Sequence, residues 1–190
     1  MGKARSSTIA PIKMFEMNNI LVIGYGNDLR YDDGIGQRVA NDLNLNLNFT
    51  IKSLAVHQLT PELAETIVKA DLVIFVDACL SLQSSDNSGH KSLTKLASNP
   101  DVQVRMLEPD SNKTLGGHTA NPESLLAFTQ VIYSYCPPAL LVTVLGENFQ
   151  LGDKLSSTGE IGVAIAIEKI TQIINQEQDK KGTNICMKLD

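Results

Sequence analysis

The sequence predicts a three-layer α/β fold, a mostly parallel twisted sheet with helices on both faces. Two observations predict it. Short apolar runs of strand length alternate with amphipathic segments of helix length, as in βαβ units with right-handed crossovers. Several of these runs are apolar at nearly every position, as strands buried on both faces are. The simplest arrangement is the flavodoxin-like, doubly wound order 2-1-3, with further strands beyond the third.

In the first half of the chain we expect three strands and two helices. We expect buried strands over 19–24 and 72–77. Polar and apolar residues alternate over 49–56, which predicts another strand between them. Apolar residues at every fourth position predict a helix over 35–43. Thr60 followed by proline predicts the start of a helix that ends near Lys69.

In the second half we expect an edge strand over 102–107, with a hairpin partner near 92–96. A helix over 121–133 and a buried strand over 139–145 follow. Ser157 and Glu160 form a capping box that opens the last helix.

The composition is that of one domain. The chain has 190 residues, 43% hydrophobic and 19% charged, a balance that excludes global disorder. We expect a disordered extension over 1–17, the α/β domain over 18–178 and a frayed tail over 179–190. A net charge of −5 without a basic stripe argues against a nucleic acid partner.

No apolar run approaches the ~20 residues of a membrane helix, so we expect no membrane partner. Three cysteines at long spacings, with no Cys-x-x-Cys pair, exclude a disulfide scaffold and indicate a reducing cytoplasm. We therefore expect a cytoplasmic protein, and we expect it to be a monomer.

Acidic side chains follow two strands that the predicted order makes neighbours. Asp28, Asp32 and Asp33 lie in the loop after the first strand, and Asp77 ends the third. Adjacent strands are ~4.8 Å apart, so these carboxylates meet at a switch point where such sheets bind ligands. A later loop carrying His118 can fold over the same crevice. The set fits either a divalent transition metal or an acid/base pair with an orienting histidine.

A dinucleotide site at Gly24-x-Gly26 is the main alternative from the motif alone. The third glycine of that fingerprint would fall on Leu29. Asp32 and Asp33 would face the pyrophosphate, where amides and positive potential are needed. The acidic end of the motif favours a cation over a phosphate.

The stretch Ile-Leu-Val-Ile-Gly-Tyr-Gly-Asn-Asp-Leu-Arg-Tyr-Asp-Asp-Gly-Ile-Gly (20–36) closely resembles the opening of the nickel–iron hydrogenase maturation endopeptidases. The resemblance continues through 73–78 and Gly117-His118 and covers about residues 18–175. It implies a protease, assigned to the aspartic type, that removes a C-terminal peptide from the hydrogenase large-subunit precursor after nickel insertion.

The resemblance also implies the site residues. The family's metal-contacting positions fall on Asp33, Asp77 and His118, and the first is glutamate in many members. Nickel would arrive with the precursor, held by its thiolates, and Asp33 or Asp77 would serve as general base. Two other functions stay open: a nickel-sensing chaperone that does not cleave, and a nucleotide-binding flavodoxin-like module.

A finer resemblance concerns the segment after the second strand. Many relatives carry an Asp-Gly-Gly-Thr-like sequence where this chain has His57-Gln58-Leu59. The His-Gln-Leu version resembles proteases that serve the bidirectional, NAD-reducing hydrogenase (the HoxW type). We therefore interpret residues 57–59 as determinants of substrate specificity.

Overall fold

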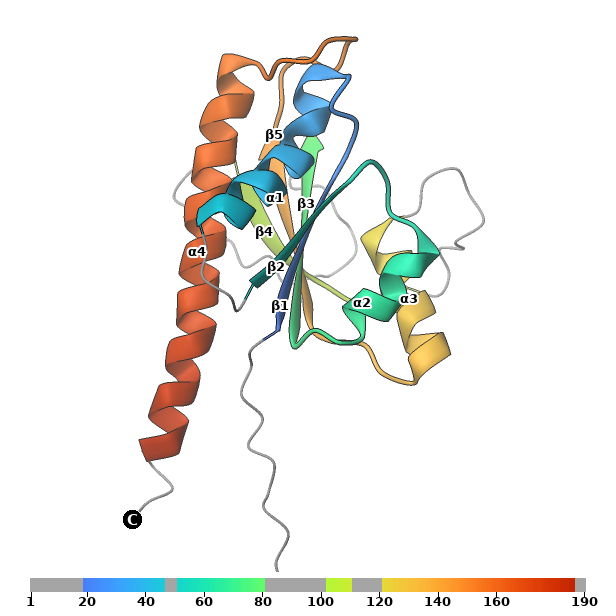
Figure 1. Cartoon of the computed structure of the whole chain (residues 1–190), viewed down its shortest axis with the longest axis vertical. Coiled ribbons are helices and arrows are strands. Elements are labelled where there is room, and N and C mark those ends of the chain that lie inside the picture. Colours follow the sequence, from blue (N-terminus) through green and yellow to red (C-terminus); the bar gives the residue numbers. More distant parts are fainter. Residues whose placement is uncertain (1–18, 47–50, 81–101, 111–120, 187–190) are drawn as a thin grey trace, which may run out of the picture.

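The computed structural model describes residues 19–46, 51–80, 102–110 and 121–186 (Figure 1). The described strands are β1 (Ile20–Tyr25), β2 (Ile51–Val56), β3 (Leu72–Cys79), β4 (Val102–Leu107) and β5 (Ala139–Leu145). The helices are α1 (Ile35–Asn46), α2 (Ala64–Ile67), α3 (Pro122–Tyr133) and α4 (Ser157–Cys186), with short 3₁₀ turns η1 (Tyr31–Gly34) and η2 (Pro61–Leu63).

The described strands form one five-stranded sheet in the order β2-β1-β3-β5-β4. The first four of these neighbours are parallel, and β4 joins β5 antiparallel at the edge. The expected 2-1-3 core and the edge position of residues 102–107 are both confirmed. Because β1 and β3 are neighbours, the loops that leave their carboxyl ends meet at one end of the sheet.

Helices cover both faces of the sheet, with α1 and α4 on one side and α2 and α3 on the other (Figure 1). The alternation of strand side chains divides the core between these faces. In β3, Ile74 and Val76 point to the α1/α4 side, whereas Val73 and Phe75 point to the α2/α3 side. Continuing the alternation, Asp77 lies on the α2/α3 face, beyond Phe75.

Glycines bring the start of α1 directly against the sheet. A Cβ on Gly36 would overlap the carbonyls of Tyr25 and Val76, so only glycine allows this close approach. Gly26 has a φ of 136°, a left-handed conformation, and a Cβ there would overlap the carbonyl of Asp33. The glycine spacing in the first loop is therefore a packing requirement, and it holds the acidic turn η1 over the end of β1.

Three helical expectations need correction. Where a helix over 61–69 is expected, the structure has the turn η2 followed by the single helical turn α2. The helix ends there because the Ala70 N–H donates to the Ile67 carbonyl in a tight turn, after which the chain enters β3. The cap of α4 is Ser156, not Ser157: its Oγ accepts from Gly159 N–H at 2.9 Å. Finally, α4 runs to Cys186, past the expected end near Gln178, through a Glu-, Gln- and Lys-rich stretch of good helix formers.

Several expected segments lie outside the described residues. These are the amino-terminal extension over 1–17, the hairpin partner near 92–96, the loop over 113–119 and the last residues of the tail. Within the described part of the chain, no helix is long and apolar enough to cross a membrane.

Candidate functional site

Polar side chains form a row across the carboxyl end of the sheet. Asp77 is in register with Thr143, and Thr143 with Gln103. On the other side, β1 pairs with β3 up to Gly24 and Val76, so Tyr25 follows in line with Asp77. All four residues alternate onto the α2/α3 face, where the row below them is apolar in β1, β3 and β5 and carries Arg105 in β4. The row marks where the core gives way to a polar surface.

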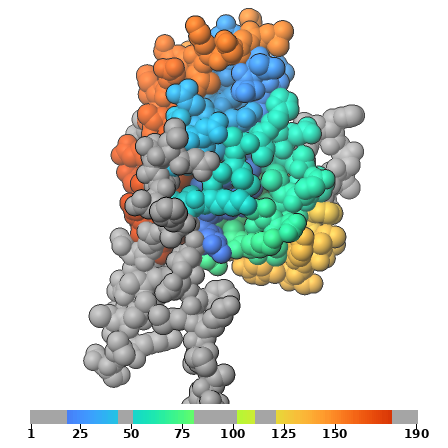
Figure 2. All heavy atoms as spheres, viewed as in Figure 1, coloured from blue at the N-terminus to red at the C-terminus, as the bar shows by residue number. Residues whose placement is uncertain are grey.

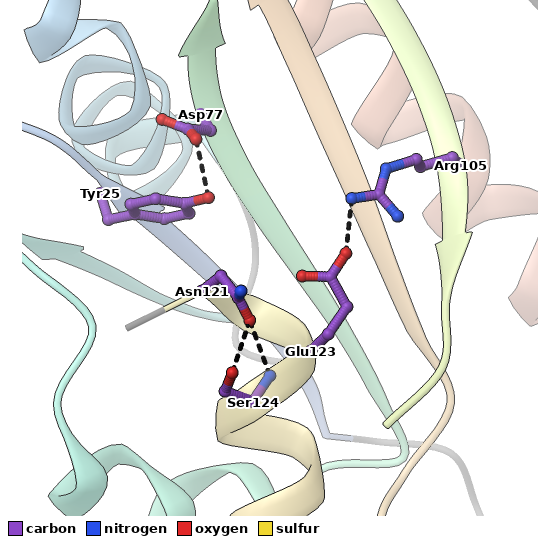
Figure 3. Close-up of polar contacts among 6 residues, drawn as sticks. All are labelled: Tyr25, Asp77, Arg105, Asn121, Glu123 and Ser124. Atoms are coloured by element: carbon purple, nitrogen blue, oxygen red, sulfur yellow. Dashed lines mark hydrogen bonds and ion pairs between the residues drawn. The ribbon is translucent and has the colours of Figure 1, made fainter. Parts of the chain in front are cut away.

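The Asp77 carboxylate is held by two donors. The Tyr25 hydroxyl donates to Oδ2 at 2.8 Å, and the Ala78 N–H donates to Oδ1 at 2.9 Å (Figure 3). Burial nevertheless dominates its ionisation and raises the pKa of Asp77 to about 6, with these hydrogen bonds opposing the shift. Asp77 is therefore a carboxyl group that titrates close to neutral pH.

Asp33 lies near enough to Asp77 to affect its charge. The negative charge of Asp33 is a further cause of the raised pKa of Asp77. Asp33 sits in η1, half-buried, and its Oδ2 accepts from Asn27 N–H at 3.2 Å. The structure thus places the two predicted carboxylates at the same end of the sheet, Asp33 in the loop after β1 and Asp77 at the end of β3.

The neighbouring Asp32 points the other way and is fully buried. Its carboxylate accepts four hydrogen bonds from the loop between β5 and α4: from the N–H groups of Glu147, Asn148 and Ser156 and from the Ser156 hydroxyl, at 2.7 to 3.0 Å. Burial alone would raise the pKa of Asp32, but these hydrogen bonds outweigh it and hold the pKa below its usual value.

Backbone hydrogen bonds join the same two loops. Tyr31 N–H donates to the Gly152 carbonyl at 2.8 Å, and Gly152 N–H donates to the Leu29 carbonyl at 2.9 Å. Arg30 adds two bonds from its guanidinium to the Phe149 carbonyl. The joined loops lie side by side at one end of the molecule (Figure 2). Asp33 is therefore carried by a braced turn.

A second polar cluster lies beside Tyr25. Glu123 in the first turn of α3 accepts from Arg105 of β4 at 2.6 Å (Figure 3). The Asn121 side chain caps α3 by accepting from Ser124 N–H at 2.8 Å. Burial raises the pKa of Tyr25, the charges of Asp77 and Glu123 raise it further, and the charge of Arg105 opposes them. The Tyr25 hydroxyl is thus in electrostatic contact with both clusters.

The predicted specificity segment follows β2 at the same end of the sheet. Val56 is in register with Tyr25, so residue 57 starts beside the loop after β1. His57 and Gln58 are exposed, whereas Leu59 is only 4% exposed and packs in the core under α2 and α3. Two of these three side chains are therefore available to a partner.

The proposed metal ligands are only partly within view. His118 lies outside the described residues, so its position relative to Asp33 and Asp77 stays a prediction. Among the residues that are described, no group of three His, Cys, Asp or Glu side chains is arranged to hold a metal ion. Asp33 and Asp77 are two of the three ligands that the resemblance implies, and the third, His118, is not among the residues described.

Sequence reasoning missed three contributors to this site: Tyr25, Arg105 and Glu123. It also grouped Asp32 with the carboxylates that meet Asp77, whereas Asp32 is buried against the loop after β5. Tyr25 could have been found, because strand alternation places it on the same face as Asp77. The roles of Asp32 and of the Arg105–Glu123 pair depend on loops and elements distant in sequence, and no local pattern signals them.

Comparison with known proteins gives the fold of this chain. No model of a known protein family matches it, and neither does any curated protein sequence. Among solved structures, the hydrogenase maturating endopeptidase HybD from E. coli is similar, with a TM-score of 0.62 at 20% identity over 84% of this chain and 93% of that one.

Two archaeal structures are similar as well. The nickel–iron hydrogenase maturation protease HycI from Thermococcus kodakarensis has a TM-score of 0.58 at 21% identity, over 83% of this chain and 93% of that one. The hydrogenase 2 maturation peptidase from a Thaumarchaeota archaeon has a TM-score of 0.57 at 21% identity, over 83% of this chain and 98% of that one. The chain therefore has the α/β fold of these proteins.

We predict that Asp32→Asn destabilises the protein by about 2 to 4 kcal/mol, because the amide group confronts buried N–H donors that a carboxylate satisfied. The exposed Asp28→Asn, in the same loop, is the matched control and is expected to change stability by less than about 0.5 kcal/mol. Urea unfolding at pH 7 measures both. Equal stabilities of the two variants would contradict the bracing role of Asp32.

The stabilisation of the folded protein by the Asp32 carboxylate depends on pH, and the direction of its pKa shift decides how. Because the pKa of Asp32 is lowered in the folded protein, its stabilisation is present above the unfolded value of about 4 and is lost as the pH falls below it. The stability gap between wild type and Asp32→Asn is therefore expected to narrow on acidification.

Proposed function

We propose that this protein is an endopeptidase that removes the C-terminal peptide of a nickel–iron hydrogenase large-subunit precursor after nickel has been inserted. The observation that carries the proposal is the pairing of Asp33 and Asp77 at the carboxyl end of the sheet. The signature stretch over 20–36 supports it, as does a fold shared with structures that are named hydrogenase maturation endopeptidases.

Peptide hydrolysis needs a base that takes a proton from water as the water attacks the scissile carbonyl. A general base works best when its pKa lies near the operating pH. Asp77, with a pKa of about 6, is mostly ionised at pH 7 and more basic than an ordinary carboxylate. We therefore favour Asp77 over Asp33 as the base, with Asp33 completing the acidic site, which makes the enzyme aspartic in type.

Nickel belongs to the substrate in this proposal. The precursor brings it on its own thiolates, and Asp33, Asp77 and His118 complete its coordination, since nickel accepts carboxylate and imidazole ligands. Such a shared site would let the protease distinguish loaded from empty precursor before cleavage. A cytoplasmic, monomeric protein acting on a folded precursor fits the composition described above.

The partner that we propose is the precursor of the bidirectional, NAD-reducing hydrogenase, as for the HoxW type. The support is the His57-Gln58-Leu59 segment, which lies at the same end of the sheet as the paired carboxylates. Because Leu59 is buried, we assign partner recognition to His57 and Gln58 and an anchoring role to Leu59.

We predict that Asp33→Asn and Asp77→Asn each abolish processing and leave the fold intact, because the change is isosteric and both residues are only half-buried. Purified variants are incubated with nickel-loaded precursor, and the released peptide is followed by mass spectrometry. Asp153→Asn, exposed in the loop before α4, is the control that retains activity.

Processing within a factor of ~10 of wild type, about 1.4 kcal/mol in the barrier, would show that the substituted residue is not essential. Wild-type protein that binds loaded precursor without releasing any peptide would instead favour the chaperone function.

We predict that replacing His57 and Gln58 by Asp-Gly, with Leu59 retained, shifts selection between two hydrogenase precursors, since discrimination is a difference of two affinities. Cleavage of the cognate precursor is expected to persist, because the paired carboxylates are untouched. Processing rates on both nickel-loaded precursors are compared, together with the melting temperature. A lowered melting temperature with unchanged selectivity would mean that the segment only shapes the turn into η2.

A further inference from the structure

The Arg105–Glu123 ion pair lies on the same face of the sheet as Asp77 and has no part in the function described so far. The two side chains come from different elements, β4 and α3, and meet on the α2/α3 face of the sheet (Figure 3). Glu123 is the more buried partner, with 12% of its side chain exposed, against 34% for Arg105. One end of the pair is therefore within the protein, and the other reaches solvent.

The pair lies close to Asp77. Arg105 is in register with Leu141, and Leu141 with Phe75, two residues before Asp77 on the same face. Neighbouring strands are ~4.8 Å apart, and β4 is two strands away from β3, so the Arg105 backbone is about 10 Å to the side of β3. An arginine side chain together with one peptide unit of a bound substrate can span that distance. The Tyr25 hydroxyl, which bonds to Asp77, is also within range of the charges of Glu123 and Arg105.

Within the residues that the structure describes, some N–H donors of the Arg105 guanidinium have no acceptor. Arginine carries five N–H donors, and here Nη2 bonds to Glu123 Oε1. Within the described part of the chain, no other acceptor contacts the Arg105 side chain. Ion pairs that are partly buried add little net stability compared with apolar residues of similar size. Glu123 therefore fixes the direction of the guanidinium while leaving N–H groups for a ligand.

Charge decides which ligand fits. The carboxylate of Glu123 neutralises the guanidinium, so the pair as a whole carries no net charge, and Asp33 and Asp77 add negative charge nearby. A second carboxylate from the ligand would meet repulsion there. A neutral, strongly polar acceptor meets none, and the commonest one on a peptide is its main-chain carbonyl.

We propose that Arg105, oriented by Glu123, is a substrate-binding residue that donates a hydrogen bond to a main-chain carbonyl of the precursor peptide beside the scissile bond. This inference rests on the proposed protease function and identifies one of its subsites. The contact is made equally in the bound substrate and in the transition state. Its loss therefore raises KM and leaves kcat nearly unchanged.

The test exchanges the two charges. The double variant Arg105→Glu/Glu123→Arg restores an ion pair between β4 and α3 but moves the guanidinium to the helix. Arg105→Met/Glu123→Gln, as a second variant, removes every donor of the guanidinium and leaves no unpaired charge. Steady-state processing of two nickel-loaded precursors with different C-terminal peptides is measured by mass spectrometry, with the melting temperature of each variant.

We expect both variants to melt within a few degrees of wild type, with KM raised at least 10-fold on both precursors and kcat changed by less than about 3-fold. Wild-type KM in a folded exchange variant would overturn the inference and leave a structural ion pair. If the exchange variant does not fold, an unchanged KM in Arg105→Met/Glu123→Gln overturns it in the same way.

Two further outcomes are informative. A loss on only one precursor would replace the main-chain carbonyl by a side-chain contact and overturn the assignment. Wild-type protein that processes neither precursor would overturn the protease function and this inference with it, whereas normal wild-type processing with unaffected variants overturns the inference alone.

Discussion

The buried carboxylate of Asp32 is the interaction on which the candidate site depends. It accepts hydrogen bonds from residues 115 to 124 positions away along the chain, and so it joins the loop after β1 to the loop after β5. Together with the backbone hydrogen bonds between the same loops, this junction fixes the conformation of the turn η1. With it, the next residue, Asp33, is held on the opposite side of the turn, toward Asp77.

The three aspartates show how environment separates identical side chains. Asp32 is buried and Asp77 is half-buried, and the loss of water disfavours the charged form of each. Asp32 receives four donors and stays ionised, as a structural anion requires. Asp77 receives only two and faces the charge of Asp33, so that its pKa rises toward neutrality. The first residue stabilises the scaffold, and the second is suited to exchange protons.

Much of the fold could be predicted because it follows from local patterns. The apolar runs gave β1, β3 and β5, and the strand order followed from parallel crossovers. The meeting of Asp33 and Asp77 could be predicted for the same reason. The roles of neighbouring Asp32 and Asp33 could not be separated, because the side that each faces depends on the distant Ser156. The Arg105–Glu123 pair likewise requires the packing of α3 on β4.

The central claim is that Asp33 and Asp77 form one electrostatically coupled pair. Its most direct test is the titration of the Asp77 carboxyl carbon by NMR in wild type and in Asp33→Asn. We expect an Asp77 pKa of about 6 in wild type and a lower value in the variant, because the neighbouring negative charge is gone. An Asp77 whose pKa is the same in both proteins would contradict the pairing, and with it the proposed site.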